Sequence, residues 1–202
     1  MFYDPRSEEH GLAHSPWTAL VVPRPIGWIS SLSADGTANL APYSFFNAVS
    51  GVPPFVMFSS AGRKDSQSNI EETGEFVVNM AVADLKDALN ISSAPFAPGI
   101  DEFERAGLEK AACRNVRVPR VAASPVALEC VLNRVVPLTA RDGTKVRSEV
   151  IFGEVVGIHI ADEVIVDGML DITRIRPLSR LGYMDYAITD DVFSMARPVL
   201  EE

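Results

Sequence analysis

The first strong strand signal is the stretch Ile26-Gly27-Trp28-Ile29-Ser30-Ser31-Leu32-Ser33, which Asp35-Gly36 follows. The stretch is rich in residues that favour strands. Asp-Gly is a typical dipeptide of tight hairpin turns. The segment therefore predicts a strand, a turn and a second strand.

Further runs of strand-forming residues occupy 44–49, 55–59, 76–80, 126–136 and 146–160, with a second hairpin signal at Arg141-Asp142-Gly143-Thr144. Helix signals are short: 66–73, capped by Asp65 or Ser66 and closed by Gly74, then 85–90 after a cap at Asp84, and 102–106. Because hairpins dominate and βαβ alternation is scarce, we expect a mainly β protein with short helices, arranged as a closed or nearly closed barrel.

Size and charge exclude several classes of protein. A chain of 202 residues with 22% charged residues suits one globular domain. We assign residues 17–190 to it, with an N-terminal arm at 1–16 and a C-terminal tail at 191–202. A net charge of -9 disfavours nucleic acid as a partner. No apolar run is long enough to cross a membrane, and two cysteines without a leader segment indicate a cytoplasmic protein.

Metal ligation is not expected. His10 and His14 have the spacing of ligands on one helical face, but neither a cysteine nor a third histidine lies near them. A solvated arm is the simpler interpretation.

A phosphate site is indicated between a predicted strand and a predicted helix. Ser59, Ser60, Arg63, Lys64, Asp65 and Ser66 surround the expected helix start. Free N–H groups at a helix start attract anions, and the cations and hydroxyls add donors. Walker and dinucleotide-binding glycine patterns are absent, which favours a monophosphate. The same residues would also suit a capped surface helix.

A second stretch mixes aromatic and small polar residues: Ala41, Pro42, Tyr43, Ser44, Phe45, Phe46 and Asn47. Apolar side chains could shield a flat ring while nearby backbone N–H groups bond to its heteroatoms. A core strand is the alternative interpretation.

His159 is the candidate catalytic side chain. Strict alternation would place Gly153, Val155, Gly157 and His159 on one strand face, where the glycines leave room for a ligand. His159 would then contact nicotinamide or tune a bound ring. The alternative is a hydrogen-bonded structural histidine.

Taken together, these segments resemble the flavin reductase-like proteins that bind FMN in a split β-barrel. The resemblance rests on residues 23–31, 39–47, 64–66, 73–79, 124–130 and 153–159, in that order, within a comparison that spans about residues 15–186. It implies a homodimer that binds FMN, with the phosphate near Lys64-Asp65-Ser66 and the ring against residues 41–47. It also implies that Ser30 and Ser31 flank the ring or ribityl chain, that Ser59 and Ser60 approach the phosphate, and that Tyr183 completes the pocket.

The resemblance leaves three functions open. The first is an NAD(P)H-dependent flavin reductase that passes electrons to an acceptor or a partner oxygenase. The second is an FMN electron carrier without NAD(P)H turnover, which would need a redox partner protein. The third is a non-catalytic flavin-binding module.

Overall fold

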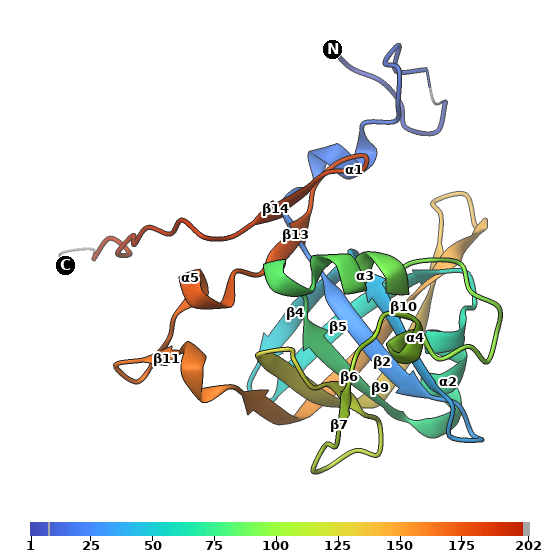
Figure 1. Ribbon diagram of the computed structural model, residues 1–202. Coiled ribbons are helices and arrows are strands. Elements are labelled where there is room, and N and C mark those ends of the chain that lie inside the picture. Colours follow the sequence, from blue (N-terminus) through green and yellow to red (C-terminus); the bar gives the residue numbers. More distant parts are fainter. Residues whose placement is uncertain (8, 200–202) are drawn as a thin grey trace.

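A seven-stranded antiparallel sheet bends into a barrel (Figure 1). The computed structural model describes residues 1–7 and 9–199. The strand order is β3-β2-β6-β9-β10-β5-β4, so the two sequence neighbours β3 and β4 occupy the opposite edges. The barrel strands are β2 (Gly27–Leu32), β3 (Ala38–Tyr43), β4 (Phe46–Gly51), β5 (Pro54–Ala61), β6 (Glu75–Met80), β9 (Val126–Thr139) and β10 (Lys145–Ile160).

Short helices and small strand pairs surround this barrel. The helices are α1 (Trp17–Leu20), α2 (Asp65–Thr73), α3 (Lys86–Ser92), α4 (Glu102–Arg105) and α5 (Ile172–Ile175), with 3₁₀ turns η1 (Ala83–Leu85) and η2 (Asp162–Val164). The remaining strands are β1 (Arg24–Pro25), β7 (Lys110–Ala111), β8 (Arg120–Val121), β11 (Ile165–Val166), β12 (Met169–Leu170), β13 (Leu178–Arg180) and β14 (Tyr186–Ile188). The predicted class, mainly β with short helices, is confirmed.

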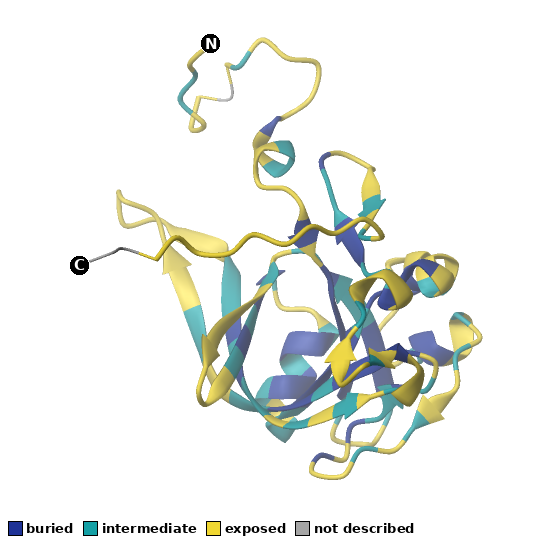
Figure 2. Ribbon diagram, turned by 90° about the vertical axis from the view of Figure 1, so that its left-hand side faces the viewer, coloured by how far each residue is buried: buried dark blue, intermediate teal, exposed yellow. Residues whose placement is uncertain are grey.

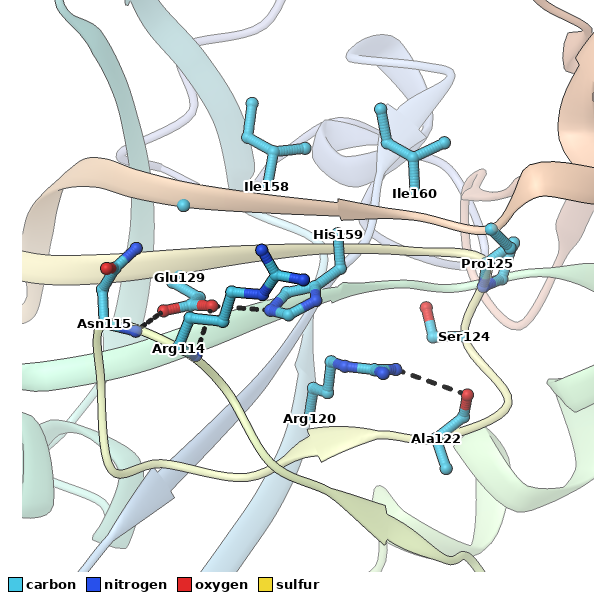
Figure 3. A pocket seen from close by; sticks show the side chains of 12 residues that line it. Arg114, Asn115, Arg120, Ala122, Ser124, Pro125, Glu129, Ile158, His159 and Ile160 are labelled. Carbon is cyan, nitrogen blue, oxygen red and sulfur yellow. Dashed lines mark hydrogen bonds and ion pairs between the residues drawn. The ribbon is translucent and has the colours of Figure 1, made fainter.

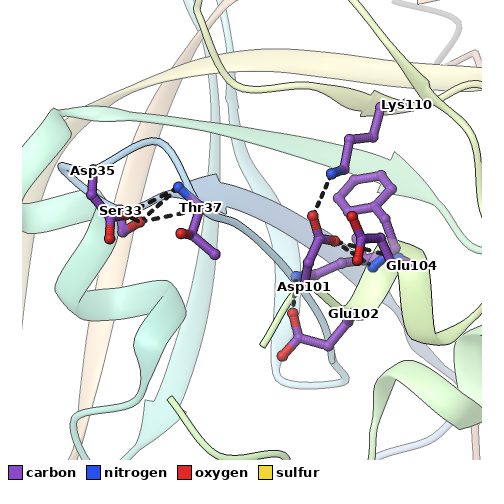
Figure 4. Close-up of polar contacts among 9 residues, drawn as sticks. Ser33, Asp35, Thr37, Asp101, Glu102, Glu104 and Lys110 are labelled. Atoms are coloured by element: carbon purple, nitrogen blue, oxygen red, sulfur yellow. Dashed lines mark hydrogen bonds and ion pairs between the residues drawn. The ribbon is translucent and has the colours of Figure 1, made fainter. Parts of the chain in front are cut away.

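Both predicted hairpins form. The β2–β3 turn is held by the Asp35 carboxylate, which accepts a hydrogen bond from the Thr37 N–H at 3.1 Å and another from the Ser33 hydroxyl (Figure 4). The second hairpin joins β9 and β10, the longest strands of the sheet.

The three predicted helices are present: the one at 102–106 starts at Glu102 as predicted, and the other two have shifted starts. α2 ends at Gly74, whose φ of 76° suits a glycine cap. It begins after Lys64, so the predicted cap at Asp65 or Ser66 is wrong by one or two residues. The second helix begins as a 3₁₀ turn rather than after a cap at Asp84. No helix in the described part of the chain is long and apolar enough to cross a membrane.

Two hydrophobic cores hold α2, α3 and α4 against the sheet. Inside the barrel, Ile70 of α2 packs with Phe58, Phe76 and Ile151, which are all fully buried. On the outside, Trp28 and Leu40 pack against Leu89 of α3 and Phe103 of α4. Burying such side chains contributes about 1.5–3 kcal/mol each. These cores fix the start of α2 beside β3 and the α3–α4 segment.

Hydrogen bonds from one arginine join the segment before β1 to the residue after β13. The Arg24 guanidinium donates hydrogen bonds to the carbonyls of Thr18 and Val21 and, at 2.8 Å, to that of Leu181. Beyond this link, the described residues of 1–15 and 189–199 are largely exposed (Figure 2). No helix forms among the described residues before Trp17, so the helical spacing of His10 and His14 does not apply.

Candidate functional site

A pocket of about 420 Å³ lies where β3, the start of α2 and the α3–α4 segment meet. Its size falls in the range of small-molecule sites. It brings together six of the predicted site residues: Ala41, Tyr43, Ser44, Lys64, Asp65 and Ser66. The strand and the helix start that were predicted to hold a ring and a phosphate thus line the same pocket.

The start of α2 supplies donors to this pocket. No side chain caps the helix, and Lys64, at the N-cap position, has extended backbone angles. The Ser66 hydroxyl is buried and accepts a hydrogen bond from Asn39 Nδ2 at 2.9 Å. Its own hydrogen can therefore be donated to the neighbouring Tyr43 hydroxyl or to an acceptor in the pocket. The Lys64 ammonium forms no ion pair with the residues that the structure describes.

The Tyr43 hydroxyl is the clearest sign of a ligand. Tyr43 is 7% exposed and its ring packs against Phe58, with centroids 4.6 Å apart. Its hydroxyl oxygen is buried and makes no well-aligned hydrogen bond with the described residues, although the hydroxyls of Ser66 and Ser60 lie close to it. Burial raises the pKa of Tyr43 by more than the neighbouring Ser66 and Ser60 hydroxyls lower it, so the Tyr43 hydroxyl keeps its proton and can donate. Because an unpaired buried hydroxyl costs about 1–3 kcal/mol, an acceptor in the pocket would remove a penalty.

The far wall of the pocket was not predicted from the sequence. It consists of the 92–98 segment, which carries Phe96, and of Glu102 at the start of α4. The Glu102 carboxylate accepts a hydrogen bond from the Leu40 N–H at 2.8 Å, and the neighbouring Asp101 caps α4 (Figure 4). Burial raises the pKa of Glu102. The only sequence sign of this wall is a Pro- and Gly-rich segment between two short helices.

Three of the predicted serines lie inside the protein rather than on the pocket wall. Ser30 donates to the Pro119 carbonyl at 2.7 Å, and Ser31 accepts from Asn69 Nδ2 at 3.2 Å. Ser60 donates to the Gly62 carbonyl at 2.8 Å. All three are fully buried, and their hydroxyls hold β2, α2 and the end of β5 in place.

The other predicted residues also lie outside the lining. Phe46 covers Gly27, where a Cβ would come within 2.6 Å of its ring. Asn47 accepts from the Ala48 N–H, and the Ser59 N–H donates to the carbonyl of Phe45. Phe45 itself is half-exposed near Arg24. Arg63 pairs with Glu71, and Tyr183, in the β13–β14 turn, lies near the His14 ring with centroids 5.8 Å apart.

The predicted strand face around His159 is wrong, because β10 contains a bulge. Val155 pairs with Cys130 of β9 and Gly157 pairs with Glu129, so Val156 is an additional residue. Cys130 belongs to the barrel core, whereas the adjacent Glu129 points outward. Gly153 therefore faces the core, where a Cβ would collide with Phe76, and Gly157 with His159 faces outward.

His159 lines a second pocket, of about 510 Å³, on this outer face. Its Nε2 lies 2.6 Å from a carboxylate oxygen of Glu129. The two pockets have no lining residue in common. The structure therefore separates His159 from the residues near Lys64.

The first pocket fits one end of a flavin mononucleotide. A lysine, a helix start and two hydroxyls with free hydrogens suit a phosphate. Ala41, Pro42 and Phe96 supply the apolar surface that a flat ring needs. The fit rests on the donor set of this chain, above all on the unpaired Tyr43 hydroxyl.

Comparison with solved structures finds close structural relatives. Component B of nitrilotriacetate monooxygenase from Bacillus cereus is 31% identical, with a TM-score of 0.88 and coverage of 96% of this chain and 98% of the other. The 2-nitrobenzoate 2-nitroreductase of Pseudomonas fluorescens is 27% identical, with a TM-score of 0.85 and coverage of 100% and 98%. A protein with a split barrel domain from Shewanella frigidimarina has a TM-score of 0.80 at 19% identity, covers 97% and 94%, and supports the fold alone.

The predicted split barrel is confirmed by these structural likenesses. The family of flavin reductase like domains matches residues 19–178, which is most of the chain. The match includes the β2–β3 hairpin, the start of α2 and the bulged strand β10. This chain belongs to the flavin reductase-like family.

Proposed function

We propose that the protein binds FMN in the pocket at Lys64 and acts as an NAD(P)H-dependent flavin reductase. One observation carries the FMN site: the buried Tyr43 hydroxyl, which makes no well-aligned hydrogen bond, belongs to the same pocket as Lys64 and Ser66. Family membership supports a flavin as the ligand. The uncapped start of α2 favours the mononucleotide, because it offers one compact anion site.

The donors of the pocket and the edge of β3 have different parts in this proposal. Lys64 neutralises the phosphate, and the hydroxyls of Ser66 and Tyr43 donate hydrogen bonds to it. Asn39 orients the Ser66 hydroxyl by donating to its oxygen. Ala41, Pro42 and Ser44 provide the edge of β3 along which the ring would lie.

When bound, FMN supplies the redox chemistry: it accepts a hydride from NAD(P)H and passes electrons to an acceptor. The protein contributes position and electrostatics, and Phe96 with the 92–98 segment limits the access of water to one side of the pocket. The relative from Bacillus cereus is a monooxygenase component, which supports a partner oxygenase as the acceptor.

We also propose that the functional unit is a homodimer. Val156, Ile158 and Ile160 form an apolar row on one face of β10 and are 38%, 57% and 40% exposed. A second copy of this chain would cover the row, and Phe45, just before β4, and Val49 on β4 are similarly exposed. Light scattering on the purified protein should give a mass of two chains; a mass of one chain at micromolar concentration would contradict this part of the proposal.

The test is a titration of apoprotein with FMN, followed by flavin fluorescence. The double variant Lys64→Ala/Ser66→Ala should bind FMN about tenfold or more weakly, because hydrogen bonds to charged groups contribute about 1.5–3 kcal/mol each. Lys86→Ala is the matched control, since Lys86 is exposed on α3 and lies outside the pocket. Equal affinities of all three proteins would refute the site.

Turnover needs a separate measurement. Anaerobic addition of NADH or NADPH to the FMN complex should reduce the bound flavin and so bleach its absorbance band. Bound FMN that neither nucleotide reduces would instead identify an electron carrier or a binding module.

A further inference from the structure

We propose that the pocket at His159 binds the phosphate group of a small organic anion, independently of the flavin site. Arg114, Asn115, Arg120, Glu129 and His159 line it (Figure 3). Figure 3 shows the arginine and histidine side chains on one side of β10, with Ile158 and Ile160 pointing to the other side. With about 510 Å³, the pocket exceeds what a lone inorganic ion needs and suits a small molecule.

Two arginines in this pocket have no carboxylate partner. Among the described residues, neither Arg114 nor Arg120 forms an ion pair, although the chain has 27 acidic and 18 basic residues. Arg120 Nε is buried without a hydrogen-bond partner, and Nη1 makes only a long contact of 3.5 Å to the Ala122 carbonyl. In so acidic a protein, two adjacent unpaired guanidinium groups indicate a site for an anion.

The one carboxylate in the lining does not satisfy these arginines. Glu129 accepts hydrogen bonds from the backbone N–H groups of Arg114, Asn115 and Val116, at 2.9, 2.6 and 3.2 Å. His159 Nε2 forms a fourth hydrogen bond with the same carboxylate. These four contacts use the lone pairs of both oxygens. Apart from the long contact of Arg120 to the Ala122 carbonyl, the guanidinium groups therefore keep their donors for a ligand.

Glu129 also fixes the proton on His159. A carboxylate only accepts hydrogen bonds, so the short contact requires the hydrogen on Nε2. Nδ1 has no hydrogen-bond partner among the described residues and remains for the ligand. It accepts a hydrogen bond from a protonated phosphate or, when His159 is charged, donates one to the anion.

The glycine in β10 lets two side chains of the pocket approach the strand closely. At Gly157, a Cβ would come within 2.7 Å of Asn115 Nδ2 and 3.0 Å of the Glu129 carboxyl carbon. Asn115 Nδ2 donates to the Val156 carbonyl at 2.9 Å, which ties the arginine-bearing segment to the bulge in β10. The bulge thus sets the geometry of the pocket.

A metal is the competing ligand. Donor atoms of Cys113, Glu129 and His159 lie within 4.8 Å of one another. Burial and the Glu129 charge raise the pKa of Cys113 to about 11, so the thiol is protonated at neutral pH. The saturated Glu129 carboxylate and the two guanidinium groups further disfavour a cation. An anion is the ligand that these charges favour.

The proposal is tested by calorimetric titration of the full chain with inorganic pyrophosphate as the probe. We expect saturable binding that weakens at high salt, and Arg114→Gln and Arg120→Gln should each weaken it about tenfold. Arg117→Gln is the matched control, because Arg117 lies on the same segment but faces Glu75. Arg114 is exposed, so its variant should fold normally even if Arg120→Gln does not.

Three results would show that this pocket is not an anion site. They are the absence of pyrophosphate binding, equal losses in Arg114→Gln and Arg117→Gln, and a thiolate absorption band with Co²⁺ that Cys113→Ser abolishes. FMN affinity serves to separate the two sites, since Arg114→Gln should leave it unchanged. Loss of FMN binding in this variant would mean that the anion site belongs to the flavin and is not independent.

Discussion

Replacing Glu129 by alanine should strongly destabilise the protein. The carboxylate is 1% exposed in its side chain and accepts three consecutive backbone N–H groups together with His159. Each hydrogen bond to a charged group contributes about 1.5–3 kcal/mol, but water can reach part of the segment because Arg114 and Asn115 are exposed. We therefore expect a loss of about 3–5 kcal/mol, as for other broken buried charge contacts.

Urea denaturation measures this loss. With an m-value of about 2 kcal/mol per molar, the midpoint should fall by roughly 1.5–2.5 M. Glu154→Ala, on the neighbouring strand β10, is the control, because Glu154 makes no ion pair with the described residues. A loss below about 1 kcal/mol for Glu129→Ala would show that the segment does not depend on the carboxylate.

The loss of folding stability at low pH should test the same hydrogen bonds of Glu129. Burial opposes ionisation of Glu129, but hydrogen bonds from the Arg114 and Asn115 N–H groups and from His159 outweigh it and lower its pKa. Because the pKa of Glu129 is lower in the folded than in the unfolded protein, its ionised form stabilises the fold. This contribution is complete above the unfolded-state pKa and is lost as the pH falls through the folded-state pKa. Below about pH 4, the wild type should therefore lose more stability than Glu129→Gln.

Three further substitutions test other parts of the account. Gly153→Ala should cost about 1–3 kcal/mol in thermal or urea unfolding, because its Cβ would overlap the buried Phe76 ring, and an unchanged midpoint would contradict the assigned strand face. Tyr43→Phe should leave the apoprotein as stable or slightly more so, yet weaken FMN binding several-fold, since it removes the unpaired hydroxyl. Glu102→Gln should stabilise the protein at neutral pH by about 1 kcal/mol or less. The pKa of Glu102 is raised in the folded protein, so its contribution to folding stability declines as the pH rises and the carboxyl ionises. A loss of stability in Glu102→Gln at pH 7 would show that the charge of Glu102 is required.

Local chemistry made much of the fold predictable from the sequence. Asp35-Gly36 and Asp142-Gly143 mark the two hairpins, and Gly74 ends α2, because each requires a particular backbone conformation. The start of α2 was displaced, since Lys64 rather than a capping side chain precedes it. Helix propensity does not determine where a helix begins when tertiary packing holds that helix in place.

The arrangement of the side chains was harder to predict from the sequence. Alternation along β10 assumed a regular strand, and the extra residue Val156 moved His159 to the outer face. The hydroxyls of Ser30 and Ser31 look like ligand groups in sequence, yet both form hydrogen bonds inside the fold. Glu102 and Phe96 reach the pocket only through the packing of α3 and α4, which no local pattern encodes.

The most direct test is a crystal structure of the protein grown with FMN. We expect phosphate density at the start of α2, within about 3.2 Å of the hydroxyls of Ser66 and Tyr43, and a ring along β3. Density for FMN in the His159 pocket, or at any surface away from Lys64, would contradict the proposed site.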